Sequence, residues 1–286
     1  MRKVALITGI NGMDAQYLSA HLIRDGYEVH GIGRGTKSSG MDCVYHQGDI
    51  RDTCSLPHTL GIVKPTHIFN LAAQSNVSQS LDLAETTTET NALGVVNLLH
   101  SYRSCCPDAK FFQASSSEMF GNSSHPHDPK YEHTPMDPVT PYGLSKLYAH
   151  KMCQFYRERF KLFISCGIMF NHTSEIQSDE FLIPKVIKAA VAIKKGEANE
   201  LKVGNTDVRR DWGHSCDYTM AMKLMLEHSV PDDFVISSGR GLSVYYLIKC
   251  AFEALELDYK KYTIQDPALI RPVDQICIYG DSMKAK

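Results

Sequence analysis

The N-terminal segment constrains the fold most, because it reads as a strand, a glycine loop, a helix and a second strand in that order. An apolar run at 4–8 predicts a buried parallel strand, and Gly9 and Gly12 follow it in a loop that opens an amphipathic segment. Gly26 separates this segment from a second predicted strand at 28–32. Such glycines let the backbone approach a pyrophosphate, which the free N–H groups of a helix N-terminus bind. The order favours a dinucleotide-binding unit over an ordinary strand–turn–helix.

Segments typical of strands and helices alternate through most of the chain, which predicts an α/β fold with a Rossmann-type, doubly wound parallel sheet. The expected strands are 44–46, 67–71, 110–114 and 162–170, and the expected helices lie near 53–63, 91–104, 141–160, 181–195 and 215–228. Beyond Phe170 the pattern loosens into polar loops, which indicates a smaller substrate lobe interleaved with the sheet. The predicted boundaries are 1–170, with 210–238 returning, for the dinucleotide-binding domain, and 171–209 with 239–286 for the lobe.

The composition fits a single compact cytoplasmic enzyme. With 286 residues and 43% apolar content, the chain is long enough to bury a full α/β core. A net charge of −2 argues against nucleic acid or a membrane surface as the main partner, and no apolar stretch approaches the roughly 18 residues of a membrane span. The nine cysteines are scattered and read as reduced thiols. The 13 histidines show no metal-ligand spacing, so no metal site is predicted.

The end of the second strand indicates which nicotinamide cofactor is used. NAD-binding chains usually place a carboxylate there to hold the ribose 2′-hydroxyl. Here Gly33 is followed by Arg34, which can pair with a 2′-phosphate, so we expect NADP; a solvated basic loop is the alternative. After the third strand, Asp49 either faces the adenine amino group or belongs to an ordinary turn, and the spacing alone does not distinguish the two.

Tyr142 and Lys146 lie four residues apart in a predicted helix and therefore on one helix face. A free tyrosine has a pKa of about 10 and is a poor base at neutral pH. An ammonium beside the phenol, together with an oxidised nicotinamide, would lower that pKa toward the working range. The same pair occurs on solvated helix faces, so it indicates catalysis only within a dinucleotide-binding fold.

Longer motifs recur over essentially the whole chain. They are TGINGMD (8–14), NLAAQS (70–75), ASSSEMFG (114–121), SKLYA (145–149), FNH (170–172), GN (204–205), RDWGH (210–214) and DY (217–218). Through these motifs the chain resembles the extended short-chain dehydrogenase/reductases, and among them most closely the GDP-mannose 4,6-dehydratase family.

The resemblance implies roles for individual residues. It makes Ser116, Glu118, Tyr142 and Lys146 catalytic. It implies NADP contacts at Gly9, Asn11, Gly12, Met13, Asp14, Arg34, Asp49, Ile50, Leu71, Ala72 and Ala73, and also at Tyr142 and Lys146. It implies contacts with the nucleotide sugar, GDP-mannose, at Ser75, Asn171, Lys185, Arg210, Arg271 and Asp274. Without the family motif, the isolated arginines would be read as surface ion pairs.

Glu118 favours dehydration over hydride transfer alone. A 4,6-dehydratase oxidises C4 of the sugar, eliminates water across C5–C6 and returns the hydride to C6. The C4 ketone acidifies the C5 proton, so the Glu118 carboxylate can remove it, and the C6 hydroxyl then leaves with a proton from Glu118 or through Ser116. The alternatives are a structural carboxylate at position 118, another sugar-nucleotide dehydratase, decarboxylase or epimerase, and a catalytically impaired, cofactor-bound scaffold protein.

The chain departs from the family pattern in ways that bear on assembly. Residues 173–179 are acidic and lack the arginines with which the family binds cofactor across a tetramer interface. Pro184 and Gly35 each stand where the family has a basic residue. The chain ends at Lys286, before the family's usual end, so the substrate lobe is expected to lack a closing helix. The resemblance implies that the helices near 91–104 and 141–160 pair between two copies, and we expect a homodimer, with a tetramer as the alternative.

Overall fold

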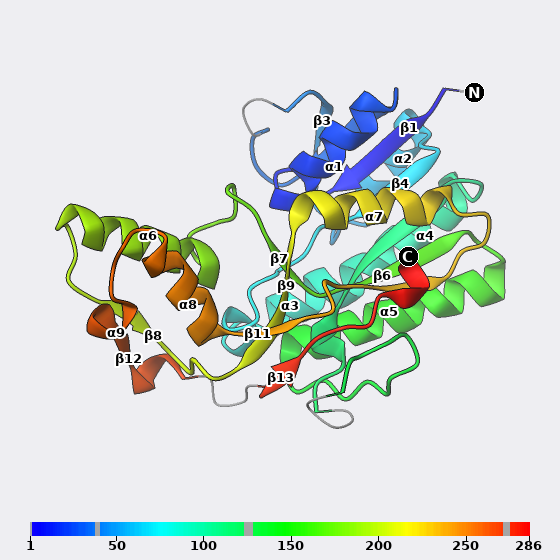
Figure 1. The fold of residues 1–286 in the computed structure, drawn as a ribbon. Coiled ribbons are helices and arrows are strands. Elements are labelled where there is room, and N and C mark those ends of the chain that lie inside the picture. Colours follow the sequence, from blue (N-terminus) through cyan, green and yellow to red (C-terminus); the bar gives the residue numbers. More distant parts are fainter. Residues whose placement is uncertain (1, 38–40, 123–127, 271–274) are drawn as a thin grey trace.

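A seven-stranded parallel sheet forms the centre of the computed structural model, which describes all residues except 1, 38–40, 123–127 and 271–274 (Figure 1). The strand order is β10-β6-β5-β4-β1-β2-β3, so the chain winds outward in both directions from β1. This confirms the predicted doubly wound sheet. The strands are β1 (Val4–Thr8), β2 (Glu28–Gly33), β3 (Val44–Gln47), β4 (His67–Asn70), β5 (Lys110–Ser116), β6 (Ile164–Met169) and β10 (Asp233–Ile236).

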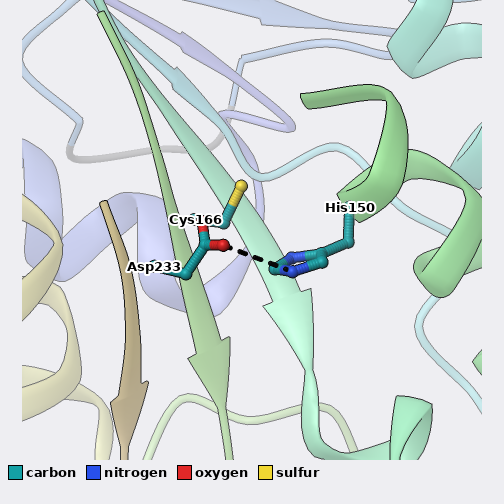
Figure 2. Close-up of side chains that lie close together, drawn as sticks. All are labelled: His150, Cys166 and Asp233. Carbon is teal, nitrogen blue, oxygen red and sulfur yellow. Dashed lines mark ion pairs between the residues drawn. The ribbon is translucent and has the colours of Figure 1, made fainter. Parts of the chain in front are cut away.

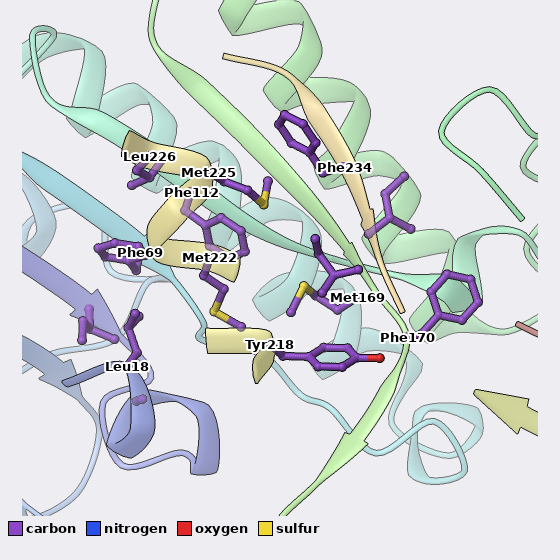
Figure 3. Close-up of a cluster of buried hydrophobic side chains, with 14 of the residues drawn as sticks. Leu18, Phe69, Phe112, Met169, Phe170, Tyr218, Met222, Met225, Leu226 and Phe234 are labelled. Atoms are coloured by element: carbon purple, nitrogen blue, oxygen red, sulfur yellow. The ribbon is translucent and has the colours of Figure 1, made fainter. Parts of the chain in front are cut away.

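Helices cover both faces of the sheet: α1 (Met13–Arg24) and α7 (Ser215–Glu227) on one, and α2 (Ser55–Val63), α4 (Gly94–Cys105) and α5 (Pro141–Phe160) on the other. They do so because the strands are apolar on both sides. In β1, Ala5 and Ile7 join the core under α1 and α7, whereas Val4 and Leu6 join the opposite core. Figure 3 shows the first core, to which α7 contributes Met222 among other side chains.

The helix predicted at 91–104 begins earlier than expected. α3 (Ala84–Thr88) and a π-helical turn (Glu89–Leu93) lead into α4, and their polar sequence gave no apolar periodicity that could reveal them. Within this turn the Asn91 side chain accepts a hydrogen bond from the backbone N–H of Gln74 at 2.8 Å and donates one to its carbonyl at 2.9 Å. The turn therefore fixes the loop that follows β4.

The smaller lobe has its own core, which includes Val186, Ile248 and Phe252. Its elements are β7 (Asn171–Thr173), α6 (Leu182–Lys195), β8 (Leu201–Val203), β9 (Arg209–His214), β11 (Gly241–Ser243), α8 (Val244–Glu253), α9 (Tyr259–Tyr262), β12 (Thr263–Gln265) and β13 (Cys277–Ile278). The structure confirms the helix expected near 181–195, whereas no prediction covered α8. The chain leaves the large sheet after β6 and re-enters it at β10. None of the helices in the described ranges has the length and apolar character needed to span a bilayer.

Candidate active site

A cavity of about 720 Å³ opens where the carboxyl ends of β1, β4, β5 and β6 face the smaller lobe. Doubly wound sheets bind ligands at this place, because the strand order reverses there. The residues that line it include these predicted site residues: Gly9, Asn11, Gly12, Met13, Asp14, Leu71, Ala73, Ser75, Ser116, Glu118, Tyr142, Lys146, Asn171 and Arg210. Segments far apart in the sequence thus meet around one space.

The loop between β1 and α1 is shaped for close approach of a ligand. Gly9 has a φ of +70°, and a Cβ at this position would lie 2.8 Å from the backbone of Ala72, so only glycine fits. Gly12 precedes α1 without a side chain that could cap the helix. The first N–H groups of α1 therefore remain available to an anion.

An ion pair joins the first turn of α1 to the segment that follows β6. The Nε2 atom of His172 lies 2.9 Å from an Asp14 carboxylate oxygen, and its Nδ1 lies 2.8 Å from the carbonyl of Phe170. Burial alone would lower the pKa of His172, but the Asp14 carboxylate outweighs it and raises the pKa. With an acceptor at each nitrogen, the ring can donate two hydrogen bonds as an imidazolium, which compensates the negative charge of Asp14 beside the anion site.

Helix α5 carries Tyr142 and Lys146 into the cavity. Pro141 begins the helix, and the Thr140 hydroxyl caps it by accepting a hydrogen bond from the Gly143 N–H at 3.0 Å. The Lys146 ammonium donates a hydrogen bond to the carbonyl of Ala114 in β5 at 3.0 Å and lies 5.7 Å from the centre of the Tyr142 ring. The structure thus brings the predicted pair together on one buried helix face.

Burial dominates the protonation of this pair in the protein itself. Burial raises the pKa of Tyr142 to about 12, against a lowering contribution from its hydrogen bond with Ser116. Burial lowers the pKa of Lys146 to about 8. The Lys146 ammonium, which donates to Ala114, does not by itself bring the pKa of Tyr142 toward neutrality, because desolvation dominates. A positive charge delivered with a ligand would be needed to reverse it.

Ser116 and Glu118 lie where β5 ends. The Ser116 hydroxyl accepts a hydrogen bond from the backbone N–H of Glu118 at 3.2 Å, which turns the chain sharply at this point. Gly143 in α5 packs so closely that a Cβ there would lie 2.7 Å from the Glu118 carbonyl. The close contact sets Ser116 and Glu118 against the first turn of α5, in the same cavity as Tyr142.

The side of the cavity that the smaller lobe forms carries polar side chains, which could contact another part of a bound ligand. Arg210 is buried, and its Nη1 donates to the carbonyls of Arg209 and Gln275, both at 2.8 Å. Asn171 pairs with Trp212 in the register of β7 and β9. Within the described residues, the Asn171 Oδ1 and Trp212 Nε1 atoms are buried without a hydrogen-bond partner, and both residues line the cavity.

Other predicted site residues lie outside this cavity lining. Lys185 is exposed on α6, Arg34 is exposed after β2, and Ile50 is buried against Gly94. Ala72 does not line the cavity, and its N–H donates to the Thr8 hydroxyl at 3.2 Å. Arg271 and Asp274 fall outside the described residues.

Asp49 is held by an arginine that the sequence reasoning missed. The Arg51 guanidinium contacts both carboxylate oxygens, at 2.8 Å for Nη2 and 3.2 Å for Nε, and its Nη1 lies 3.3 Å from a Glu89 carboxylate oxygen. The hydrogen bonds from Arg51 lower the pKa of Asp49. An adenine amino group would thus have to share a carboxylate that is already paired.

The sequence reasoning also missed cavity residues in two of the motifs it quoted. His172 and Trp212 were recognised as family motifs but given no role. Trp212 is the only tryptophan of the chain, and a single large aromatic residue between Asp211 and Gly213 was the available signal. Ile176, Gln177 and Ser178 also line the cavity, although this acidic segment was considered only for assembly.

Solved structures share this fold. A dTDP-glucose 4,6-dehydratase from Bacillus anthracis, in complex with NAD, superposes with a TM-score of 0.85 over 99% of this chain and 89% of that chain, at 21% sequence identity. At this identity the similarity establishes the fold alone, which agrees with the doubly wound sheet described above.

Sequence relatives are closer. Residues 6–286 match the family model for GDP-mannose 4,6 dehydratase. GDP-mannose 4,6 dehydratase 2 of Arabidopsis thaliana is 37% identical, covering 100% of this chain and 81% of the relative. GDP-mannose 4,6 dehydratase of Homo sapiens is 40% identical, covering 88% of this chain and 72% of the relative. The chain therefore belongs to the GDP-mannose 4,6-dehydratase family.

Proposed function

We propose that the chain is a GDP-mannose 4,6-dehydratase that converts GDP-mannose to GDP-4-keto-6-deoxymannose. The observation that carries this proposal is the position of Glu118, which lines the same cavity as Ser116, Tyr142 and Lys146. Oxidation of a sugar hydroxyl requires only Ser116, Tyr142 and Lys146. A carboxylate beside them provides the separate acid–base group that eliminating water demands.

We infer that the cofactor is NADP. The glycine loop fits a dinucleotide, because Gly9 leaves a cradle that a Cβ would fill and the first N–H groups of α1 are uncapped. Arg34 follows β2 in place of an acidic residue and suits a 2′-phosphate. When bound, the nicotinamide supplies reversible acceptance of a hydride from the sugar. His172 offsets the charge of Asp14, which would otherwise repel the pyrophosphate.

The protein's own groups divide the proton transfers between them. Tyr142 takes the proton of the C4 hydroxyl, and its hydrogen bond with Ser116 stabilises the charged phenolate. Lys146 stays close to the ring and favours the same form when it is protonated. Glu118 takes the C5 proton after C4 becomes a ketone. The same carboxyl then returns a proton to the departing C6 hydroxyl, so that water leaves and Glu118 is again ionised. After it takes up a proton from solvent, Glu118 supplies the proton that C5 gains when C6 is reduced.

Substrate turnover with Glu118→Gln tests this assignment. Wild-type protein, NADP⁺ and GDP-mannose in heavy water should give a product that has lost water and carries deuterium at C5, as seen by mass spectrometry and NMR. Glu118→Gln should bind both ligands yet form little of this product. A variant that makes the deuterated 6-deoxy product at the wild-type rate would show that the carboxylate is structural, and the dehydratase proposal would lose its support.

We further propose that two copies pair through α4 and α5. Leu144, Tyr148 and Phe155 are exposed on one face of α5, and Leu93 is exposed just before α4. Contiguous exposed apolar residues are typical of interaction surfaces. Light scattering should give the mass of a dimer, and Tyr148→Glu should shift it toward the monomer, whereas Leu224→Glu, at an exposed position of α7, should not. A monomeric or tetrameric wild type would contradict the proposal.

We infer a cytoplasmic location from the thiols. All nine cysteines belong to the described part of the chain, and all are free. Three of them, Cys153, Cys166 and Cys277, are buried. Unpaired cysteines in this number suit a reducing compartment, where disulfides rarely persist.

A further inference from the structure

Beside the cavity, helix α5 carries a second buried cluster that the proposed chemistry does not use. Figure 2 shows His150 on α5, Cys166 on β6 and Asp233 on β10 facing one another, with the imidazole directed at the carboxylate. One potential ligand atom from each of the three lies within 4.8 Å of the others. All three residues are buried, so the cluster is either a metal site or an internal network.

The neighbours of Asp233 argue for a network. The Arg157 guanidinium donates to both carboxylate oxygens, at 2.8 and 3.1 Å, and the Gln154 amide donates to Oδ2 at 2.7 Å. Burial raises the pKa of Cys166 well above its usual range, so its sulfur is a neutral thiol. A cation would have to displace a guanidinium and ionise that thiol. A buried carboxylate requires a charged or hydrogen-bonding partner, and Asp233 already has one in Arg157.

The hydrogen bonds assign the proton of His150. The Gln154 Nε2 atom donates to Asp233, and the same nitrogen lies 3.1 Å from the Nε2 atom of His150. Asp233 Oδ2 also lies 3.6 Å from this ring nitrogen, and although burial would lower the pKa of His150, Cys166 and Asp233 raise it. In the imidazolium both ring nitrogens carry a proton, and in the neutral ring that accepts from Gln154 the proton lies on Nδ1, so Nδ1 carries a proton in either form. That nitrogen lies 2.9 Å from the hydroxyl of Ser115, to which it therefore donates. The network runs from β10 through α5 to β5.

The hydrogen-bond network ends at Ser115, next to the proposed catalytic groups. Ser115 lies between Ala114, whose carbonyl accepts from Lys146, and Ser116, whose hydroxyl bonds to Tyr142. His150 is one helical turn after Lys146, so α5 is attached to consecutive residues of β5 by two bonds side by side. The pair of bonds fixes both the rotation and the axial position of the helix against the strand.

We propose that His150 is a positioning residue that holds α5 in register with β5 through Ser115, and thereby sets the contact between Tyr142 and Ser116. The inference rests on the proposed function of that pair. A displacement of about 1 Å in a catalytic group can cost on the order of a hundredfold in rate. A bond on the adjacent turn of the same helix limits such displacement without touching substrate or cofactor.

Two isosteric variants separate this role from simple packing. In His150→Asn the amide nitrogen lies near the former Nδ1 and still donates to Ser115, whereas in His150→Gln it reaches the former Nε2 side and loses Ser115. We expect His150→Gln to lower kcat roughly tenfold to a hundredfold with an unchanged KM for GDP-mannose. His150→Asn should restore kcat to within a few-fold of wild type. Ser115→Ala removes the acceptor with little loss of volume and should match His150→Gln.

A second measurement does not depend on the substrate. Hydrogen exchange followed by mass spectrometry should show faster exchange in peptides covering 110–117 and 141–150 for His150→Gln and Ser115→Ala, and near wild-type exchange for His150→Asn. If wild type fails to turn over GDP-mannose, the proposed function fails while this comparison still decides the positioning role. Equal defects in both His150 variants, or wild-type exchange and kcat in Ser115→Ala, would overturn the inference.

Discussion

The two walls of the cavity are built differently. On the large-sheet side, Tyr142, Lys146 and Ser116 are buried and linked to each other or to the backbone of β5. On the opposite side, the segment with Ile176 and Glu180 is largely exposed and is tied by few contacts, such as one of 3.4 Å between the Gln79 amide and Glu180. Groups that perform chemistry require fixed positions, which regular elements supply, whereas loops can vary with the ligand.

The largest effect should come from the rigid wall. Tyr142→Phe removes the hydroxyl that takes the C4 proton but keeps the ring, so turnover of GDP-mannose should fall roughly 10²–10⁴-fold. Substrate should remain unchanged and the absorbance of reduced cofactor should not develop. As a control, Tyr148→Phe alters an exposed tyrosine of the same helix and should retain activity. Near wild-type turnover by Tyr142→Phe would remove the distinction between the two walls.

The next effect concerns the stability of the same wall. Although burial opposes it, pairing with Arg157 lowers the pKa of Asp233 to about 2 from an ordinary value of 3.8. The unfolded chain therefore takes up this proton first as the pH falls. Ionised Asp233 therefore adds about 2 kcal/mol to the free energy of unfolding. This contribution is complete above about pH 4 and is lost as the pH falls toward 2.

The variant Asp233→Asn tests whether this contribution to stability is lost as the pH falls. The variant leaves Arg157 without its carboxylate and should lose about 3–5 kcal/mol of unfolding free energy near pH 7. Its stability should also fall less steeply than that of wild type between pH 4 and 2, as measured by urea unfolding. Asp232→Asn is the matched control, because Asp232 is about half exposed and an asparagine oxygen can still accept the hydrogen bond that the Asp233 N–H donates to the Asp232 Oδ1 atom. Parallel acid profiles for wild type and Asp233→Asn would contradict the assignment.

The same contrast explains what the sequence could predict. Apolar periodicity and the glycine loop revealed the sheet, and the i,i+4 spacing placed Tyr142 and Lys146 on one face, because these features depend on local geometry. The raised pKa of Tyr142, the Arg51–Asp49 pair and the His150 network depend on burial and on contacts between distant segments. Composition and spacing carry no such information. The early start of the helix that ends in α4 was hidden by its polar first turns.

A smaller effect is expected at the cofactor's adenosine end. Arg34 is exposed, so its contact with a 2′-phosphate would be partly screened. Arg34→Ala should weaken NADP binding about tenfold, with little change for NAD. Quenching of Trp212, the only tryptophan and a cavity residue, offers the readout. Arg24→Ala provides an exposed control on α1; equal affinity of wild type for NAD and NADP would contradict the NADP assignment.

The smallest effect should come from the exposed wall. Glu175 lies 3.5 Å from the Nε2 atom of His214, and both side chains are largely in solvent, at 73% and 47% exposure. The hydrogen bond to Glu175 is one cause of the raised pKa of Tyr17, after burial, so the three side chains anchor the segment that leads to Ile176. Exposed pairs contribute little because water and salt screen them. Glu175→Gln should therefore leave kcat unchanged and alter the KM for GDP-mannose less than about threefold. Steady-state kinetics at low and high salt would check this. A fall in kcat as large as that caused by a substitution in α5 or β5 would contradict this expectation. It would show that the exposed segment also positions the reacting groups.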